Sequence, residues 1–396
     1  MMNDLSPLQK RVVLIGWSTY AAYYLGRVNL AAALPAMELD LHWTPAQTSV
    51  FAGAMLWTYA LGQLFNGWLG EQLAPRLMVF LGIVGSAVVN LLMAVVSNYD
   101  TLVFLALVNG FLQAMGWGPI LRTLSEALSN DQRRRIAGFF GVSYIVGNTI
   151  TWLLTGLLLA GGRWQSVFIL PPLLMLAMGL IWYRFSRPIQ AVNTFSTFSG
   201  RKTIAVAIGQ FWPFLVTAVI AGGLFNGVLF YAPSFVAQTL PNNQAALTAI
   251  IFPVFGLIGT MGLNSMVLRR TQGHLLRGII ILLLLSAAVR GLALVLPLST
   301  LNSAILLGAL GVTAYALTNM LLSAVPLLYS HLGTSQVAGL MDATHSIGGA
   351  LGSSLVGLLL GEGGWPLVFA AWMILPLVGV LFVSIGLRGT VASSRP

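Results

Sequence analysis

Residues 162–168 read Gly-Arg-Trp-Gln-Ser-Val-Phe, and residues 363–369 read Gly-Gly-Trp-Pro-Leu-Val-Phe. The two stretches are 201 positions apart, roughly half the length of the chain. Three further pairs keep this spacing: Ala137-Gly138 with Ala338-Gly339, Gly147 with Gly348, and Gly156 with Gly357. Because several motifs recur in the same order, the sequence predicts an internal duplication and therefore two similarly folded halves.

The composition places the duplicated chain in a membrane. Of its 396 residues, 57% are hydrophobic and 7% are charged, and the mean hydropathy is +0.88. A soluble domain carries about 25% charged residues, so this chain cannot cover a water-facing surface. The net charge of +10 could indicate nucleic acid, but the arginines lie in short links between apolar runs. We therefore expect the lipid bilayer, and no nucleic acid, as the surroundings of this protein.

The apolar runs predict the number of helices, because a bilayer core needs about 20 apolar residues per span. The fold class that we expect is an all-α membrane protein with twelve transmembrane helices in two pseudo-symmetric six-helix halves. The halves would be residues 1–184 and 209–396, joined by a cytoplasmic linker over 185–208. The runs are at roughly 12–37, 47–70, 76–97, 101–128, 136–160, 166–184, 209–237, 245–268, 274–297, 300–330, 335–360 and 365–387.

The charged links alternate along the chain, and this alternation predicts the topology. Links rich in arginine, such as 133–135 and 269–270, alternate with links that carry acids, such as Asp100 and Glu362. The positive-inside rule then places both termini and the 185–208 link in the cytoplasm. We expect a multi-pass protein of the bacterial inner membrane. There is no cysteine, which excludes disulfides and cysteine-bound metal.

An arginine lies within the first apolar run, in the stretch Tyr20-Ala-Ala-Tyr-Tyr-Leu-Gly-Arg27-Val-Asn29. A guanidinium inside a membrane keeps its proton and needs water or a partner. At helical spacing Tyr20, Tyr23, Tyr24 and Arg27 share one face. The sequence favours an anion site on a translocation path, and the alternative is a structural arginine held by backbone carbonyls.

Two other pairs of charged or titratable residues lie in apolar runs. Arg122 and Glu126 are four positions apart, so they either neutralise each other or leave Arg122 to face a cavity. Asp342 and His345 are three positions apart, and a histidine beside a carboxylate is a candidate proton-coupling site. The alternative for the second pair is a hydrogen-bonded contact between helices.

The link after the second run reads Gly67-Trp-Leu-Gly-Glu71-Gln-Leu-Ala-Pro-Arg76. It resembles the loop signature of the major facilitator superfamily, in which small, acidic and basic residues latch the cytoplasmic side. The resemblance implies that Gly67, Glu71 and Arg76 form such a latch, with Glu71 where aspartate is usual.

Motifs elsewhere resemble one family of that superfamily, the organophosphate:phosphate antiporters. They are Tyr23 to Asn29, Pro75-Arg76, Gly116-Trp-Gly-Pro119 with Arg122-Thr123, and Tyr231-Ala-Pro233. In that family two arginines grip the substrate phosphate. The first matches Arg27, whereas the second falls on Phe225 beside Asn226, and the family's substrate-site histidine falls on Tyr144.

These observations predict a secondary active transporter of a small organic anion, phosphorylated or carboxylated, that works by alternating access. The substrate-binding candidates are Arg27, Tyr20, Tyr23, Tyr24, Arg122, Tyr144, Asn226 and His345. Coupling would be to a proton or to inorganic phosphate. We expect no enzyme activity, no cofactor and no metal, and a monomer. The alternatives are an efflux antiporter for drugs or metabolites and a transporter-like sensor of a sugar phosphate.

Overall fold

The computed structural model describes residues 4–43, 45–159, 163–186, 200–236, 238–239, 248, 250–271 and 274–393. Within these residues the protein is helical throughout, and all twelve predicted runs correspond to helices. Among the described residues, nine helical segments are long and apolar enough to cross a membrane. The three other predicted runs, 12–37, 47–70 and 335–360, fall on α1 with α2, on α3 and on the first part of α16. The structure is therefore that of a multi-pass membrane protein.

The helices of the first part of the chain are α1 Pro7–Tyr23, η1 Tyr24–Gly26, α2 Val28–Asp40, α3 Pro45–Gln72, α4 Pro75–Met93, α5 Tyr99–Gln113, α6 Trp117–Ala127, α7 Asn130–Leu159, η2 Trp164–Phe168 and α8 Leu170–Phe185. The rest are α9 Gly200–Val236, α11 Ile251–Leu257, η4 Ile258–Leu263, α12 Asn264–Arg270, α13 Leu275–Val295, α14 Thr300–Asn319, η5 Met320–Ala324, α15 Val325–Leu328, η6 Ser330–Leu332 and α16 Thr334–Ser393. The η4 and η5 segments are π-helical, and α16 is interrupted at Gly364, where φ is 66°.

Local sequence explains where several helices begin. The Ser6 hydroxyl accepts the Gln9 N–H and the Gln9 side chain accepts the Ser6 N–H, which is a capping box at the start of α1. Pro75 begins α4, where its missing N–H is not needed. Helix α9 begins at Gly200, so the last residues of the predicted linker 185–208 are helical. Residues 187–199 lie outside the described residues.

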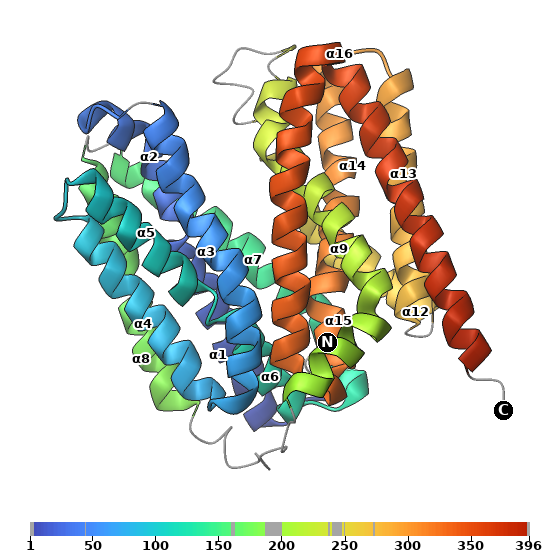
Figure 1. Ribbon diagram of the computed structural model, residues 1–396, viewed down its shortest axis with the longest axis horizontal. Coiled ribbons are helices and arrows are strands. Elements are labelled where there is room, and N and C mark those ends of the chain that lie inside the picture. The colour runs from blue at the N-terminus through green and yellow to red at the C-terminus, as the bar shows by residue number, and fades with distance from the viewer. Residues whose placement is uncertain are drawn as a thin grey trace. The chain divides into compact units, whose positions relative to one another are not determined.

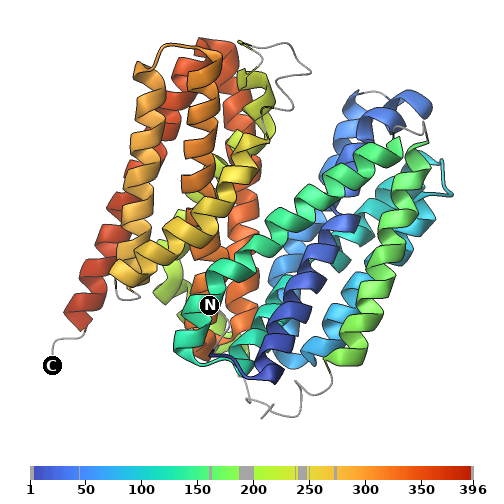
Figure 2. The same cartoon turned by 180° about the vertical axis from the view of Figure 1, so that it is seen from behind.

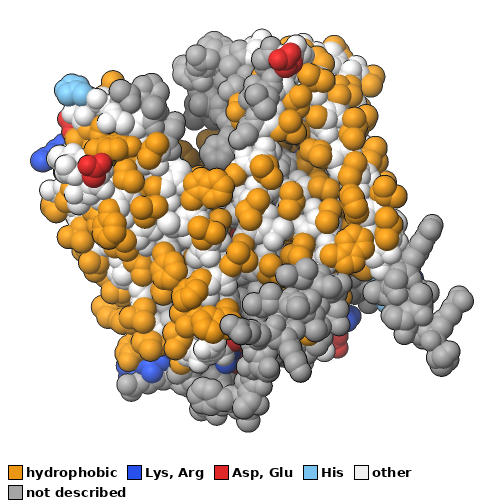
Figure 3. All heavy atoms as spheres, in the orientation of Figure 1, with side chains coloured by type: hydrophobic (Ala, Val, Ile, Leu, Met, Phe, Trp, Pro, Cys, Tyr) orange, Lys and Arg blue, Asp and Glu red, His pale blue; other side chains and the backbone are white. Residues whose placement is uncertain are grey.

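The helices form two compact units. The first contains Met1–Ile136, Ser143–Gly200 and Pro326–Ala343, and the second contains Ala137–Val142, Arg201–Val325 and Thr344–Pro396. In the first unit α3 packs along α5 and α4 packs beside α8, as both ribbon views show (Figures 1 and 2). In the second unit α13 and α14 are neighbours. In each unit, hydrophobic side chains cover most of the described surface that Figure 3 shows, and the visible charged side chains lie near its upper and lower ends. This distribution is expected for a surface that faces lipid.

The duplicated stretch contributes an aromatic pair to each unit. The rings of Trp164 and Phe168 lie 5.8 Å apart between centroids in the first unit, and those of Trp365 and Phe369 lie 5.9 Å apart in the second. Trp164 is buried in a core that α2, α3 and α5 also build, and its ring N–H donates to Asp40 over 2.7 Å. The repeated stretch therefore places a tryptophan–phenylalanine contact in each unit.

Candidate functional site

Arg27 follows the short 3₁₀ segment η1, where the first membrane helix is interrupted. Its guanidinium carbon lies 4.2 Å from the ring centroid of Tyr59 and 4.8 Å from that of Tyr24. The Nε–H donates to the Gln113 side-chain oxygen at 3.3 Å. The Nη2 atom is buried and has no hydrogen-bond partner among the described residues. Aromatic faces stabilise a cation without neutralising it, so the charge of Arg27 remains available to a ligand.

A carboxylate completes this group. Asp342, on the first part of α16, is 7% exposed. Its Oδ2 accepts hydrogen bonds from the Tyr59 hydroxyl and from the Gln63 amide, each at 2.7 Å. Asp342 also interacts electrostatically with Arg27. Gln63 and Gln113 were not among the predicted site residues. Their sequence signal is that each is a polar side chain inside an apolar run.

The three predicted tyrosines have different roles. The Tyr20 ring lies 4.3 Å from Trp117 and 5.7 Å from Tyr24 between centroids, so both tyrosines help to build the aromatic wall beside Arg27. Tyr23 is fully buried and its hydroxyl donates to the backbone carbonyl of Val79 at 2.8 Å. Tyr23 also interacts electrostatically with Arg27 across the 3₁₀ turn, and its predicted role in substrate binding stays a prediction.

Two predicted residues lie in the second unit. The Asn226 amide donates back to the Gly222 carbonyl at 3.1 Å. The His345 ring Nε2 is 3.3 Å from the Thr318 hydroxyl. These hydrogen bonds of His345 and Asp342 are therefore made within their own units. His345 contacts Thr318 in the second unit, and Asp342 accepts from Tyr59 and Gln63 in the first.

Phe225 stands where the resembling family has its second arginine. It belongs to an aromatic cluster in the second unit, with ring centroids 4.7 Å from Tyr315, 5.8 Å from Phe252 and 5.9 Å from His345. Tyr144, in the first unit, is a half-buried residue of α7. The predicted role of Tyr144 in substrate binding stays a prediction.

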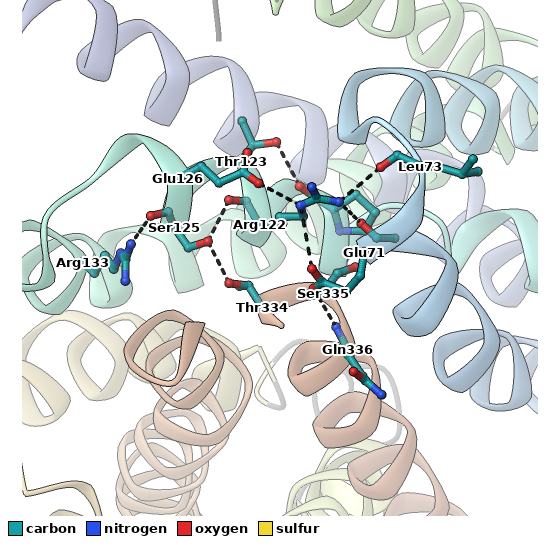
Figure 4. A network of polar contacts seen from close by, with 12 residues as sticks. Glu71, Leu73, Arg122, Thr123, Ser125, Glu126, Arg133, Thr334, Ser335 and Gln336 are labelled. Atoms are coloured by element: carbon teal, nitrogen blue, oxygen red, sulfur yellow. Dashed lines mark hydrogen bonds and ion pairs between the residues drawn. The ribbon is translucent and has the colours of Figure 1, made fainter. Parts of the chain in front are cut away.

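Arg122 belongs to a polar network at one end of the first unit and not to the group around Arg27 (Figure 4). Its Nε is 2.8 Å from Glu126 and 3.8 Å from Glu71, and its Nη1 donates to the Gly70 carbonyl at 2.7 Å. The prediction that Arg122 binds substrate is therefore corrected. Its Nη1 atom also donates to the Leu73 carbonyl at 3.3 Å, so the guanidinium joins α6 to the end of α3.

Glu71 holds the start of α16 within the first unit. Its Oε1 accepts the backbone N–H of Ser335 at 2.6 Å and that of Gln336 at 3.3 Å. A carboxylate at a helix N-terminus satisfies unpaired N–H groups and complements the helix dipole. Burial raises the pKa of Glu71, while Arg122 and the two backbone N–H groups oppose that rise.

The other two residues of the predicted latch differ in role. A Cβ added to Gly67 would lie 3.1 Å from the Ser335 carbonyl oxygen and 3.2 Å from Gly339 Cα, so glycine permits the close contact between α3 and α16. Arg76 instead donates two hydrogen bonds to the Tyr183 carbonyl and covers the Tyr183 ring at 3.8 Å. The prediction that Arg76 joins the latch is wrong, and Arg122 is the basic partner of Glu71.

A family model described as the Major Facilitator Superfamily matches residues 16–335. Because this match covers more than half of the chain, the protein belongs to the major facilitator superfamily, as its motifs predicted. The structure of FucP, a transporter of this superfamily crystallised in the outward conformation, is similar with a TM-score of 0.74. The two share 13% sequence identity, and the match covers 94% of this chain and 98% of that one.

Among curated relatives, a probable hexose phosphate transport protein of Chlamydia trachomatis is 24% identical over 41% of this chain. A putative glycerol-3-phosphate transporter of Arabidopsis thaliana is 23% identical over 84% of this chain and 72% of that protein. A D-galactonate transporter of Escherichia coli is 24% identical over 47% of this chain and 44% of that protein. The chain spans 36% of the length of the Chlamydia protein.

Proposed function

We propose that this protein is a secondary active transporter that moves a small organic anion across the bacterial cytoplasmic membrane by alternating access. Both termini would lie in the cytoplasm, as the arginine-rich links indicate. The observation that carries the proposal is the guanidinium of Arg27, held in the first membrane helix with a buried Nη2 that has no partner among the described residues. Ionised groups at this depth are expensive and mark ligand paths.

The surroundings of Arg27 favour an anion as the ligand. Its described neighbours are the rings of Tyr24 and Tyr59 and the amide of Gln113, all of which are uncharged partners. Asp342 is the nearby carboxylate, and both of its hydrogen bonds come from neutral donors. A guanidinium presents paired N–H groups that match the oxygens of a carboxylate or phosphate.

The number of cations favours a singly charged ligand. Phe225 occupies the position of the second phosphate-gripping arginine and packs among aromatic rings. Arg122 is engaged by Glu126 and by backbone carbonyls. One arginine balances one carboxylate, whereas a phosphate monoester carries nearly two negative charges at neutral pH. We therefore propose a sugar acid or a similar carboxylate, of the kind named for the D-galactonate relative, ahead of a sugar phosphate.

Thermal-shift titration of the purified protein tests this proposal, because a ligand that binds the folded state raises its melting temperature. D-galactonate, glycerol 3-phosphate and inorganic phosphate would be compared at equal concentrations. We expect the largest shift with D-galactonate, and no shift with any of them in Arg27→Ala. Arg76→Ala is the control, since Arg76 contacts Tyr183 away from this group. A shift that Arg27→Ala retains would rule out Arg27 as the anion contact.

Asp342 supports proton coupling. When ionised, it opposes an anion at Arg27, because the two residues interact electrostatically. Protonation of Asp342 would remove this competing charge, so proton and anion would each raise the affinity of the other. The titratable groups that face Asp342 and Arg27 are Tyr20, Tyr24 and Tyr59, whose hydroxyls are ordinarily neutral below about pH 10. We propose proton:anion symport with Asp342 as the coupling group.

The coupling proposal predicts a pH dependence that one substitution removes. D-galactonate affinity would be measured between about pH 5 and 8 in the wild type, in Asp342→Asn and in His345→Gln. We expect tighter binding at acid pH in the wild type and a flattened profile in Asp342→Asn. A flattened profile in His345→Gln alone would transfer the coupling role to the imidazole.

A further inference from the structure

The first membrane helix is interrupted directly before Arg27. The α-helix ends at Tyr23, a 3₁₀ turn covers Tyr24–Gly26, and Arg27 has a φ of −109° before the helix resumes at Val28. A break of this kind leaves backbone carbonyls without their helical partners. Side chains of neighbouring helices reach the Gly26 carbonyl.

Two buried asparagines donate to this carbonyl. The Asn109 amide lies 2.9 Å from the Gly26 oxygen and the Asn90 amide 3.3 Å, and both side chains are 0% exposed. A Cβ on residue 26 would lie 2.6 Å from the Met175 sulfur, so the Met175 side chain packs closely against this glycine. The break is therefore held in place by side chains of α4, α5 and α8.

The carbonyl also fixes the orientation of the next groups, because a carbonyl only accepts. The Asn109 NH₂ group must face it, which turns the Asn109 oxygen toward Ser86. The Ser86 hydroxyl donates to that oxygen over 2.6 Å and accepts from the Gln113 NH₂ group over 2.7 Å. The Gln113 oxygen is then left to accept the Arg27 Nε–H. We call Ser86, Asn90, Asn109 and Gln113 the amide network.

We propose that the amide network selects which edge of the Arg27 guanidinium meets the substrate. A guanidinium can bind two oxygens through Nε and Nη2, or through Nη1 and Nη2. Gln113 occupies Nε, so the Nη1–Nη2 edge is the one that remains for the anion. Gln113 is thus a positioning residue that acts through Arg27. This inference rests on the proposed function, in which Arg27 is the anion contact.

A double-mutant cycle tests the inference, because a positioning role must vanish when Arg27 is changed. Lysine presents a single ammonium in place of the planar guanidinium fork, so in Arg27→Lys there is no edge for Gln113 to select. Loss of a hydrogen bond to a charged group predicts that Gln113→Leu weakens D-galactonate binding about tenfold in the wild-type background. In the Arg27→Lys background the same change should leave the affinity within about twofold. Asn66→Leu is the matched control, since Asn66 is equally buried but donates to the Phe111 carbonyl outside the network.

If Gln113→Leu lowered the D-galactonate affinity equally in the wild-type and Arg27→Lys backgrounds, Gln113 would act on the fold alone. That result would overturn the inference. So would a wild-type affinity in Gln113→Leu while Arg27→Ala abolishes binding, and that result would leave the proposed function standing. Failure of Arg27→Ala to change binding would instead overturn the proposed function.

A ligand-free measurement checks the same contact. With ¹⁵N-labelled arginine, the Nε–H resonance that disappears in Arg27→Lys identifies residue 27. The hydrogen bond to Gln113 predicts slow solvent exchange of this proton in the wild type and in Asn66→Leu, and fast exchange in Gln113→Leu. Equal exchange in the wild type and in Gln113→Leu would contradict the positioning role.

Discussion

Removal of the Glu71 carboxylate should loosen the start of α16. Glu71 accepts the N–H groups of Ser335 and Gln336 at 2.6 and 3.3 Å. Loss of a side chain that caps a helix N-terminus costs about 0.5–2 kcal/mol. Because Glu71 accepts from two N–H groups, the upper end of this range applies. Arg122 keeps Glu126 and the Gly70 carbonyl as partners, so the loss of its contact with Glu71 adds little to the destabilisation. We expect Glu71→Ala to lower the free energy of local opening at the start of α16 by about 2 kcal/mol. This is roughly a 30-fold increase in the opening equilibrium constant.

Hydrogen–deuterium exchange of the peptide that covers residues 334–340 measures this opening directly. We expect exchange of the Ser335 and Gln336 amides to be about 30-fold faster in Glu71→Ala. Glu126→Ala is the control, because it removes a partner of Arg122 without touching α16. An increase of less than about threefold in Glu71→Ala, or equal increases in the two variants, would refute the capping role.

The same site should respond to pH. Burial raises the pKa of Glu71, so the capped conformation binds a proton more tightly than the open one. The stability that this protonation contributes is fully present below the ordinary glutamate pKa of about 4.3. It is lost as the pH rises through the raised pKa. Glu71→Gln keeps an acceptor oxygen and cannot titrate, so we expect slow exchange without this pH dependence.

Three further changes have defined outcomes. Arg290→Met should raise the melting temperature, because Arg290 is fully buried with Nε and Nη2 unpaired among the described residues, and an apolar replacement of a buried charge is often stabilising by about 1–4 kcal/mol. A lower melting temperature would contradict this reasoning. Gly339→Val should lower stability by about 1–3 kcal/mol, because a Cβ there lies 2.2 Å from the Gln63 carbonyl oxygen; an unchanged melting temperature would contradict the close packing of α3 and α16. Ser196→Cys should react with an impermeant thiol reagent only in inverted vesicles if the 185–208 link is cytoplasmic, and labelling in intact cells would reverse the topology.

Some residues of the candidate site could be predicted and others could not. Arg27 was predictable, because an arginine in an apolar run is costly wherever its helix lies. The hydrogen bond from the Tyr23 hydroxyl to the Val79 carbonyl was not predictable, because regular helical spacing does not anticipate the 3₁₀ turn at Tyr24–Gly26. Gln63 and Gln113 were missed, because an uncharged amide in an apolar run gives no sign of which helix it will meet.

The partner of Glu71 also could not be predicted from the sequence. Arg76 and Arg122 both follow Glu71 in the sequence, and each could have been its basic partner. The packing of α4 against α8 brings Arg76 to Tyr183, whereas α6 brings Arg122 to Glu71. Distance along the chain does not decide between them, because ion pairs form between side chains that helix packing brings within about 4 Å.

The sequence by itself determined the membrane class, the positions of the helical runs, the duplication and the charge of Arg27 within an apolar run. These properties follow from composition, from run length and from the high energy of an ion in a low-dielectric layer. Only the tertiary structure decided that Asp342, Tyr59 and Gln113 gather around Arg27, and that Arg122 and Tyr23 have other partners. Hydrogen-bond partners depend on how helices cross and where one is interrupted, and these are fixed by packing among residues far apart in the chain.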